Sequence, residues 1–382
     1  MDARPVNSLR ALVLVFLSAC VTAPARKDER PRMTVAEVTA RLPEMVSDRE
    51  GWATDVLAAL DAQQLPADPD TVCQVLAVIE QESGFQANPA VPGLAKLVRS
   101  ELDKRAEKLG PLGAPAVHEL LSGTAPGSKH TFEARLGTVK TEKDLDVLFR
   151  DILAFYRDKF PAPYKVLDLV GALFDASPED FNPVTTVGSM QVSVRFAEEL
   201  AKKQKREGVV RDELYTRSGG VFYGTARLLT YEAAYAQPLY RFADYNAGVY
   251  TSRNAAVQEQ VSTLTSLHVA PDGDLLAYDK NAEPLRRDTQ SLAAILVFRQ
   301  KFAPELTEQR VRSDVHTEKT AEFESTQTWR AIKRAWAQEN RTDAPYARVP
   351  EVTIRSPKMT QDRSTGWFAK SVDARYRRCL ER

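Results

Sequence analysis

Two glutamates near the end of one helical segment have the chemistry and the spacing of a general acid. Residues 72–79 carry apolar side chains at helical spacing, and on a helical wheel these form one face. Glu80 and Glu82 lie at the two edges of that face. A carboxylate in apolar surroundings loses hydration in its charged form, so its pKa rises and it can donate a proton near neutral pH. The wheel does not choose between the two, and an ordinary solvated glutamate is the alternative for each.

Three short motifs lie far apart in the chain. They are Glu82-Ser83-Gly84-Phe85, Gly188-Ser189-Met190-Gln191 and Tyr245-Asn246-Ala247-Gly248. In this order they resemble the Glu-Ser-x-Phe, Gly-Leu-Met-Gln and Ala-Tyr-Asn-Ala-Gly signatures of soluble lytic transglycosylases, which are related to goose-type lysozyme. The combination is also similar to a family of bacterial lipoproteins described only as a domain of unknown function. Each motif alone would recur by chance, so the resemblance depends on their combination and order.

The resemblance implies that Glu82 is a catalytic acid and base acting on peptidoglycan glycan strands. Glu82 would protonate the glycosidic oxygen between N-acetylmuramic acid and N-acetylglucosamine. It would then accept the proton of the muramoyl C6 hydroxyl as that oxygen attacks C1 and closes a 1,6-anhydro ring. One carboxylate is sufficient for this lytic reaction, whereas hydrolysis by two carboxylates needs a second acid.

The resemblance also implies substrate-binding or orienting roles for the residues around the glutamate, which are Ser83, Gly188, Met190, Gln191, Tyr245 and Asn246. Tyr245 would hydrogen-bond to Glu82 and set its orientation, while Asn246 would hold the turn or a sugar amide. Met190 and Gln191 would line the cleft. Core packing is the structural alternative for both Tyr245 and Met190.

Three departures from the typical domain put substrate preference and activity in question. The second motif normally follows soon after the glutamate, whereas here residues 91–183 intervene and would form a helical insertion. Ser189 stands where leucine is usual, and Asp244 where alanine is usual. Asp244 is a candidate second acid, although a surface cap or an ion-pair partner is the commoner role for such a residue.

The first twenty residues predict export and a lipid anchor. A basic and then apolar segment ends at Leu17-Ser18-Ala19-Cys20, which resembles the bacterial lipobox. Residues 1–19 would be a signal peptide, Cys20 the lipid-modified residue, and residues 20–33 a flexible tether. Thr22 is not the aspartate that retains such lipoproteins at the inner membrane, so the resemblance implies an outer-membrane location facing the periplasm.

Charge and metal-ligand patterns argue against other classes of function. The 52 basic and 52 acidic residues give a formal net charge of zero, which argues against a nucleic-acid-binding surface. The four histidines are scattered, and Pro271–Asp279 lacks the spacing of a calcium loop, so we expect no metal and no cofactor. In an exported chain Cys73 and Cys379 can form a disulfide, with two buried free thiols as the alternative.

The periodicity of the chain predicts a mainly α-helical, lysozyme-like fold. A lysozyme-like domain would span residues 34–260, and a C-terminal extension, residues 261–382, would pack on its core. Asp70 is the expected N-cap of the helix that carries Glu82. Weak strand signals near Leu275 and Val352 suggest a small hairpin. The expected helices cover residues 34–46, 52–60, 70–83, 94–109, 145–156, 166–174, 224–229, 292–302 and 323–336, with a terminal helix around Val372.

Two other functions remain open at this level. A muramidase on the same fold would hydrolyse the same bond with water, with Asp244 or an acid from the insertion as the base. Its products would carry a reducing end instead of an anhydro end. A non-catalytic lipoprotein would grip glycan strands or scaffold envelope machinery, and replacement of Glu82 by glutamine would leave its function unchanged.

Overall fold

The computed structural model describes residues 32–382 except for residue 109, residues 160–181, residue 183, residues 280–281 and residues 355–362. The expected signal peptide, the lipidation site Cys20 and nearly all of the tether lie outside the described residues. The helix expected over 166–174 lies outside them as well. Among the helices that are described, none is long and apolar enough to span a bilayer.

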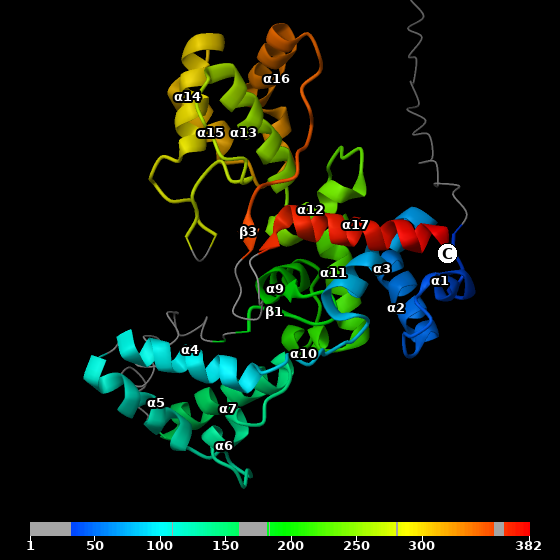
Figure 1. Cartoon of the computed structure of the whole chain (residues 1–382), viewed down its shortest axis with the longest axis vertical. Coiled ribbons are helices and arrows are strands. Elements are labelled where there is room, and N and C mark those ends of the chain that lie inside the picture. The colour runs from blue at the N-terminus through cyan, green and yellow to red at the C-terminus, as the bar shows by residue number, and fades with distance from the viewer. Residues whose placement is uncertain (1–31, 109, 160–181, 183, 280–281, 355–362) are drawn as a thin grey trace, which may run out of the picture.

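The chain is mainly α-helical, as the sequence predicts, and its first and larger core is built from three groups of helices (Figure 1). The N-terminal group consists of α1 (Val35–Arg41), α2 (Arg49–Ala62) and α3 (Pro69–Ser83). The second group consists of α4 (Leu94–Lys108), η1 (Gly110–Leu112), α5 (Gly113–Ser122), α6 (Phe132–Leu136) and α7 (Glu142–Lys159). The third group consists of α9 (Val194–Lys203), α10 (Val210–Leu214), α11 (Arg217–Leu229) and α12 (Pro238–Ala247).

A second hydrophobic core lies at the other end of the molecule, at the top of Figure 1. Its buried side chains include Val257, Phe298 and Ile332. It is formed by α13 (Thr251–Thr265), α14 (Gln290–Phe302), α15 (Glu308–Val315), η2 (Ala321–Ser325) and α16 (Gln327–Asn340). The expected boundary at residue 260 therefore falls inside a continuous helix, because α13 connects the two cores.

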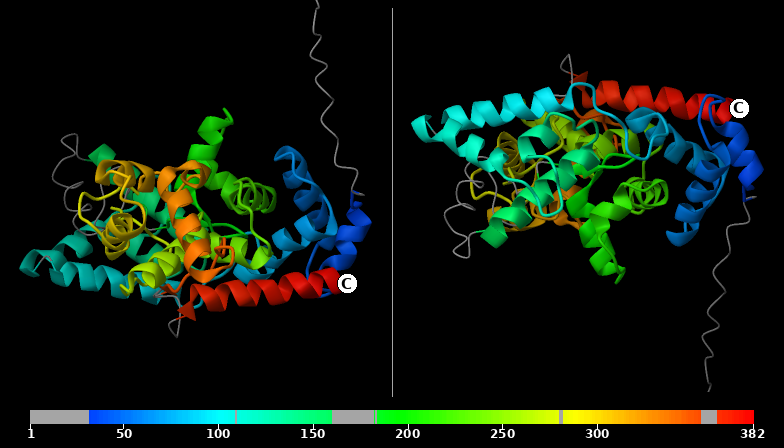
Figure 2. Two further views of the ribbon diagram at one scale, coloured as in Figure 1. Left: turned by 90° about the horizontal axis from the view of Figure 1, so that it is seen from above. Right: turned by 90° about the horizontal axis from the view of Figure 1, so that it is seen from below.

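The terminal helix α17 (Thr365–Glu381) returns from the second core to the first, where it packs against α3 and α12. Figure 2 shows it running along one edge of the molecule and ending beside α1. There Arg41 donates a hydrogen bond of 2.7 Å to the carbonyl oxygen of Cys379. The region expected as one C-terminal extension thus serves both cores.

The described residues contain two short antiparallel strand pairs. These are β1 (Thr186–Val187) with β2 (Val192–Ser193), and β3 (Thr353–Ile354) with β4 (Arg363–Ser364). The strand signal near Val352 is confirmed by β3. The strand expected near Leu275 is wrong, because the backbone N–H groups of Leu275 and Leu276 are bound by the Glu318 carboxylate, at 2.6 and 2.9 Å. Only an isolated bridge between Tyr278 and Pro284 forms there.

The N-terminus of α3 differs from the expectation by two residues. Asp68 is the N-cap, because its carboxylate accepts a hydrogen bond of 2.8 Å from the backbone N–H of Thr71, and Pro69 opens the helix. Asp70 is already inside the helix. Its carboxylate accepts hydrogen bonds from the Gln74 amide and from the Tyr376 hydroxyl of α17.

A disulfide between Cys73 and Cys379 joins α3 to α17, which confirms the bridge and excludes the alternative of two free thiols. The two Cα atoms are 5.6 Å apart, and the bridge closes a loop with a sequence separation of 306. Both residues are buried. The helix that carries Glu82 is thereby linked covalently to the terminal helix.

We expect loss of this bridge to destabilise the protein, since cross-linking a long loop lowers the entropy of the unfolded chain. The variant Cys379→Ser should lose about 2–4 kcal/mol of unfolding free energy. Thermal denaturation with and without reductant measures it. Reductant should lower the melting temperature of the parent protein but not that of the double variant Cys73→Ala/Cys379→Ala. Equal melting temperatures for parent and variant would contradict the prediction.

Candidate active site

Glu82 lies in the last turn of α3, where the chain makes a tight exit from the helix. Gly84 ends the helix in the left-handed conformation with φ 57°, and Phe85 follows with φ 62°. The Phe85 ring is buried against Trp52, with ring centroids 5.5 Å apart. The Ser83 hydroxyl donates to the carbonyl oxygen of Ile79 and accepts from the N–H of Gln86. Ser83 therefore stabilises the helix end on which Glu82 sits.

The second motif forms the turn of the β1–β2 hairpin and packs directly onto α11. Gly188 has φ 82°, and a Cβ atom added there would lie 2.3 Å from the carbonyl oxygen of Leu214. A Cβ added at Gly224 would likewise lie 2.2 Å from the Met190 sulfur. Glycine at both positions is what allows the turn to approach so closely.

Ser189 and Met190 are both completely buried by this packing. A Cβ added at Gly220 of α11 would lie 2.7 Å from the Ser189 hydroxyl oxygen, so the small serine fits a space that the usual leucine would overfill. Met190 was expected to line the cleft, and this is wrong: its side chain fills the core between the turn and α11. Its backbone carbonyl, however, is used by the third motif.

The third motif is joined to the second by a hydrogen bond of 2.8 Å from the Tyr245 hydroxyl to the carbonyl oxygen of Met190. Because the single hydroxyl proton of Tyr245 is donated to Met190, Tyr245 does not donate a hydrogen bond to Glu82. The two side chains are nevertheless close in space. Burial, and then the charge of Glu82, raise the pKa of Tyr245. Asn246 is exposed and accepts a hydrogen bond of 3.1 Å from Thr365 at the start of α17.

Gln191 connects the turn to a carboxylate that sequence reasoning did not name. Its side-chain amide donates to the Oε2 atom of Glu142 at 3.0 Å and to the carbonyl oxygen of Gly188 at 3.3 Å. Glu142 is the first residue of α7, in the insertion, and its exposed fraction is 4%. The muramidase hypothesis allows an acid from the insertion to act as the base, but no pattern in the sequence identifies Glu142 as that acid.

The electrostatics of the site favour a protonated Glu82. Part of the side chain reaches solvent, but the protein packed around the carboxyl group removes most of its hydration. This desolvation, and then the negative charge of Glu142, raise the pKa of Glu82 from 4.5 to about 8. Such a group can donate a proton at neutral pH and accept one back.

The two glutamates that the helical wheel could not separate have different surroundings. Glu80 forms ion pairs with two arginines of α17, at 3.6 Å from Arg375 and 3.3 Å from Arg378. It therefore helps to hold α17 on α3. The charge of Glu142 instead acts on Glu82, and the raised pKa that results with burial favours Glu82 as the acid.

Asp244, the candidate second acid, is a buried cap instead of a surface one. Its carboxylate accepts hydrogen bonds from the N–H groups of Tyr250 and Ser252, at 3.0 and 2.7 Å, at the start of α13. It also accepts hydrogen bonds from three hydroxyl groups, those of Tyr231, Tyr235 and Thr251. With both oxygens occupied in this way, Asp244 fixes α13 to α12 and has no free position for a catalytic water.

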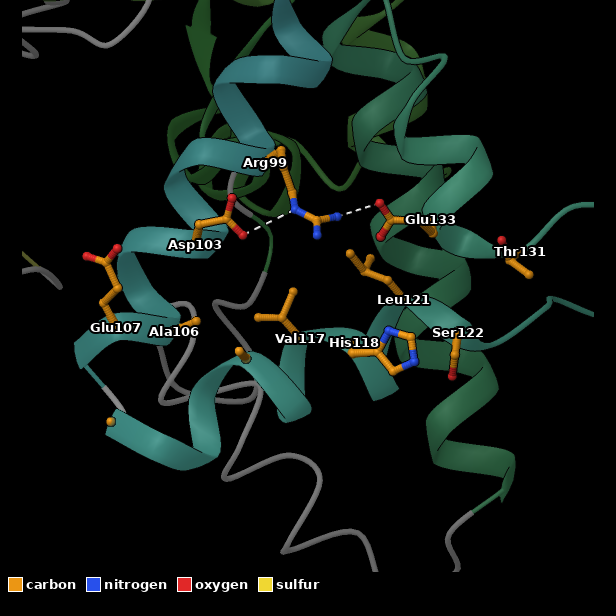
Figure 3. A pocket seen from close by; sticks show the side chains of 12 residues that line it. Arg99, Asp103, Ala106, Glu107, Val117, His118, Leu121, Ser122, Thr131 and Glu133 are labelled. Atoms are coloured by element: carbon orange, nitrogen blue, oxygen red, sulfur yellow. Dashed lines mark hydrogen bonds and ion pairs between the residues drawn. The ribbon is translucent and has the colours of Figure 1, made fainter.

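A cavity of about 780 Å³ lies apart from these residues, between α4, α5 and α6 (Figure 3). Arg99 spans its edge and pairs with Asp103 and Glu133. None of the site residues lines this cavity. Within the described ranges no group of three or more histidine, cysteine, aspartate or glutamate side chains could hold a metal ion.

The contact at Gly188 leads to a prediction about the hairpin turn. Gly188→Ala should destabilise the protein by about 2 kcal/mol or more, because the new methyl group meets the Leu214 carbonyl as well as a strained φ. Gly93→Ala is the matched control, since Gly93 has φ 73° with nothing near its Cβ position. Chemical denaturation of both variants measures the difference. Equal losses would mean that the turn can move away from the end of α10, where Leu214 lies.

The raised pKa of Glu82 predicts a pH-dependent cost to stability. A carboxyl group whose pKa is higher in the folded state contributes stability below its unfolded pKa and loses it as the pH rises to the folded value. Between pH 4.5 and about 8 the parent protein should therefore lose stability relative to Glu82→Gln. We expect the difference in melting temperature to grow by about 2 °C or more between pH 5 and pH 8. A constant difference would exclude a raised pKa for Glu82.

The comparisons with known proteins agree on one family. The model of the family described as "Protein of unknown function (DUF1615)" matches residues 45–382. A protein of Escherichia coli strain K12, named "Uncharacterized protein YaiW", is 36% identical over 384 residues, which cover 99% of this chain and 98% of that protein. No solved structure matches. The chain belongs to the DUF1615 family.

Proposed function

We propose that this chain is a peptidoglycan lytic transglycosylase in which Glu82 acts as the single acid and base. The observation that carries the proposal is the meeting of the three motifs around one carboxyl group whose pKa is raised to about 8. A carboxyl group kept protonated in a desolvated position is what protonation of a glycosidic oxygen requires. The lysozyme-like character of the first core is part of the proposal.

In the proposed reaction Glu82 donates its proton to the glycosidic oxygen as the bond from C1 of N-acetylmuramic acid breaks. The resulting carboxylate then accepts the proton of the C6 hydroxyl, whose oxygen attacks C1 and closes the 1,6-anhydro ring. No water enters, and the proton count of Glu82 is restored after each turnover. The Tyr245–Met190 hydrogen bond keeps the second and third motifs in register around the carboxyl group.

The neighbouring Glu142 favours a muramidase as the second candidate function. Hydrolysis by two carboxylates needs a base that can hold a water molecule. Asp244 does not meet this need because its oxygens bind α13, so a base would have to come from Glu142. The products distinguish the two reactions, since hydrolysis leaves a reducing end on the muramoyl residue. A non-catalytic role in gripping glycan strands is the third candidate.

The proposed location follows from the N-terminal segment. The expected tether is shorter than residues 20–33, because Met33 is buried in the first core and its N–H donates to the carbonyl oxygen of Ala67 at 2.8 Å. A lipid on Cys20 and a tether to residue 31 would hold the helical body at the outer membrane, facing the periplasm, within reach of the wall. The disulfide is consistent with such a location, because disulfides persist in exported proteins. Glycan strands are then the expected partner, and the reaction needs no cofactor.

Digestion of purified peptidoglycan tests the proposal. We expect the protein without residues 1–31 to release muropeptides whose muramoyl end lacks one water, and Glu82→Gln to reduce the rate at least about 1000-fold. The rate should also fall above about pH 8, as Glu82 loses its proton. Products with a reducing end would support the muramidase instead. If neither protein digests walls that a control enzyme digests, catalysis is excluded under those conditions and glycan binding is the property to measure.

A further inference from the structure

The insertion brings its carboxylate to Glu82 by pairing with the chain that leaves α3. The N–H of Val91 donates to the carbonyl oxygen of Lys140 at 2.8 Å, and Ala90 and Thr141 form an isolated antiparallel bridge. The Asn88 side-chain amide adds a hydrogen bond of 3.1 Å to the Thr141 hydroxyl. Residues 90–91, at the start of the insertion, are therefore paired with residues 140–141, a few residues beyond Glu82 in the chain. The helix α7 begins directly after this pairing, at Glu142.

Glu142 is held in place from the side of the hairpin turn as well. The Gln191 amide donates to its carboxylate, and Gln191 itself has the left-handed φ of 49° in the turn after Met190. The Tyr215 hydroxyl donates to the backbone carbonyl of Glu142 at 3.4 Å. Because Gln191 binds its side chain and Tyr215 binds its backbone, the buried Glu142 has little freedom to move toward a substrate.

The charged and titratable groups around Glu82 come from several elements. Tyr245 of α12 faces it, and the charge of Arg227 of α11 acts on Tyr245. Glu80 of α3 is paired with Arg375 and Arg378 of α17. On the α2 side, Arg217 of α11 is paired with Asp48 and Asp55. Among these groups and Glu142, it is the charge of Glu142 that acts on Glu82.

We propose that Glu142 is a positioning residue of the active site: its negative charge, delivered by the insertion and held by Gln191, adds to the effect of burial and helps to keep the Glu82 carboxyl group protonated and ready to act as the acid. Glu142 acts through Glu82 and does not itself contact the sugar, since it is buried beneath the turn. On this account the insertion is part of the catalytic apparatus. The catalytic role of Glu142 rests on the proposed function, but its effect on the pKa of Glu82 can be tested without substrate.

The test is the titration of Glu82 in the folded protein, followed by NMR of side-chain carboxyl carbons in protein carrying ¹³C-labelled glutamate. Loss of the Glu82 signal in Glu82→Gln assigns it. In Glu142→Gln the like charge is gone while the side-chain shape and the hydrogen-bonding capacity remain, so the pKa of Glu82 should fall by about 1 pH unit. In Glu142→Asp, which keeps the charge, it should stay near the parent value.

A second variant on the same helix controls for the general effect of removing a negative charge. Asp158 is exposed near the other end of α7, and Asp158→Asn should leave the titration of Glu82 unchanged. Equal thermal unfolding of Glu142→Gln and Glu142→Asp confirms that both are folded. If Glu82 titrates in Glu142→Gln as it does in the parent, or if Asp158→Asn has the same effect, the proposal is wrong.

The pH profile of peptidoglycan digestion gives the functional readout. In Glu142→Gln the alkaline limit of activity should move down by the same amount as the pKa of Glu82. A merely structural role would lower the rate at every pH without moving that limit. If the enzyme proves inactive, the NMR titration still decides the electrostatic proposal, so failure of the proposed function and failure of this inference are distinguishable.

Discussion

The close approach of the β1–β2 turn to α11 is the constraint on which the candidate site depends. Because Gly188 and Gly224 leave no side chain in the way, the turn lies against the backbone near Leu214, and Met190 can be buried completely. That position exposes the Met190 carbonyl to Tyr245 and directs the Gln191 amide to Glu142. A bulkier residue at either glycine would displace the turn, and every contact made from it would lengthen together.

The second constraint is the end of α3, where local and long-range forces agree. Gly84 stops the helix and Ser83 binds its last turn, so Glu82 has a defined position from local sequence alone. Its surroundings are set from elsewhere in the chain. The ion pairs of Glu80 hold α17 outside, while Glu142 approaches from the insertion. Two glutamates two residues apart therefore differ in their electrostatic surroundings because different distant segments cover them.

The sequence predicts those parts of the molecule that depend on local pattern. The helical class, the helix α3 ending near Ser83 and a strand near Val352 follow from spacing and periodicity, whereas the disulfide between Cys73 and Cys379 was one of two alternatives that the sequence left open. Helical periodicity cannot report which helices share a core, so the second core around α13–α16 was missed. Glu142 was missed because its position depends on the pairing of residues 90–91 with residues 140–141. The direction of the Tyr245 hydroxyl likewise depends on a contact with a residue 55 positions away.

The disulfide has a consequence for the order in which the chain can mature. Cys73 lies in the central helix of the first core, and its partner follows it by 306 residues. The bond cannot close until all of the intervening chain, including the whole second core, has been synthesised. The second core is therefore enclosed within a covalent loop that begins and ends in the first. Chains that have not yet been extended to residue 379 are left with a free thiol at Cys73, which marks them chemically as unfinished.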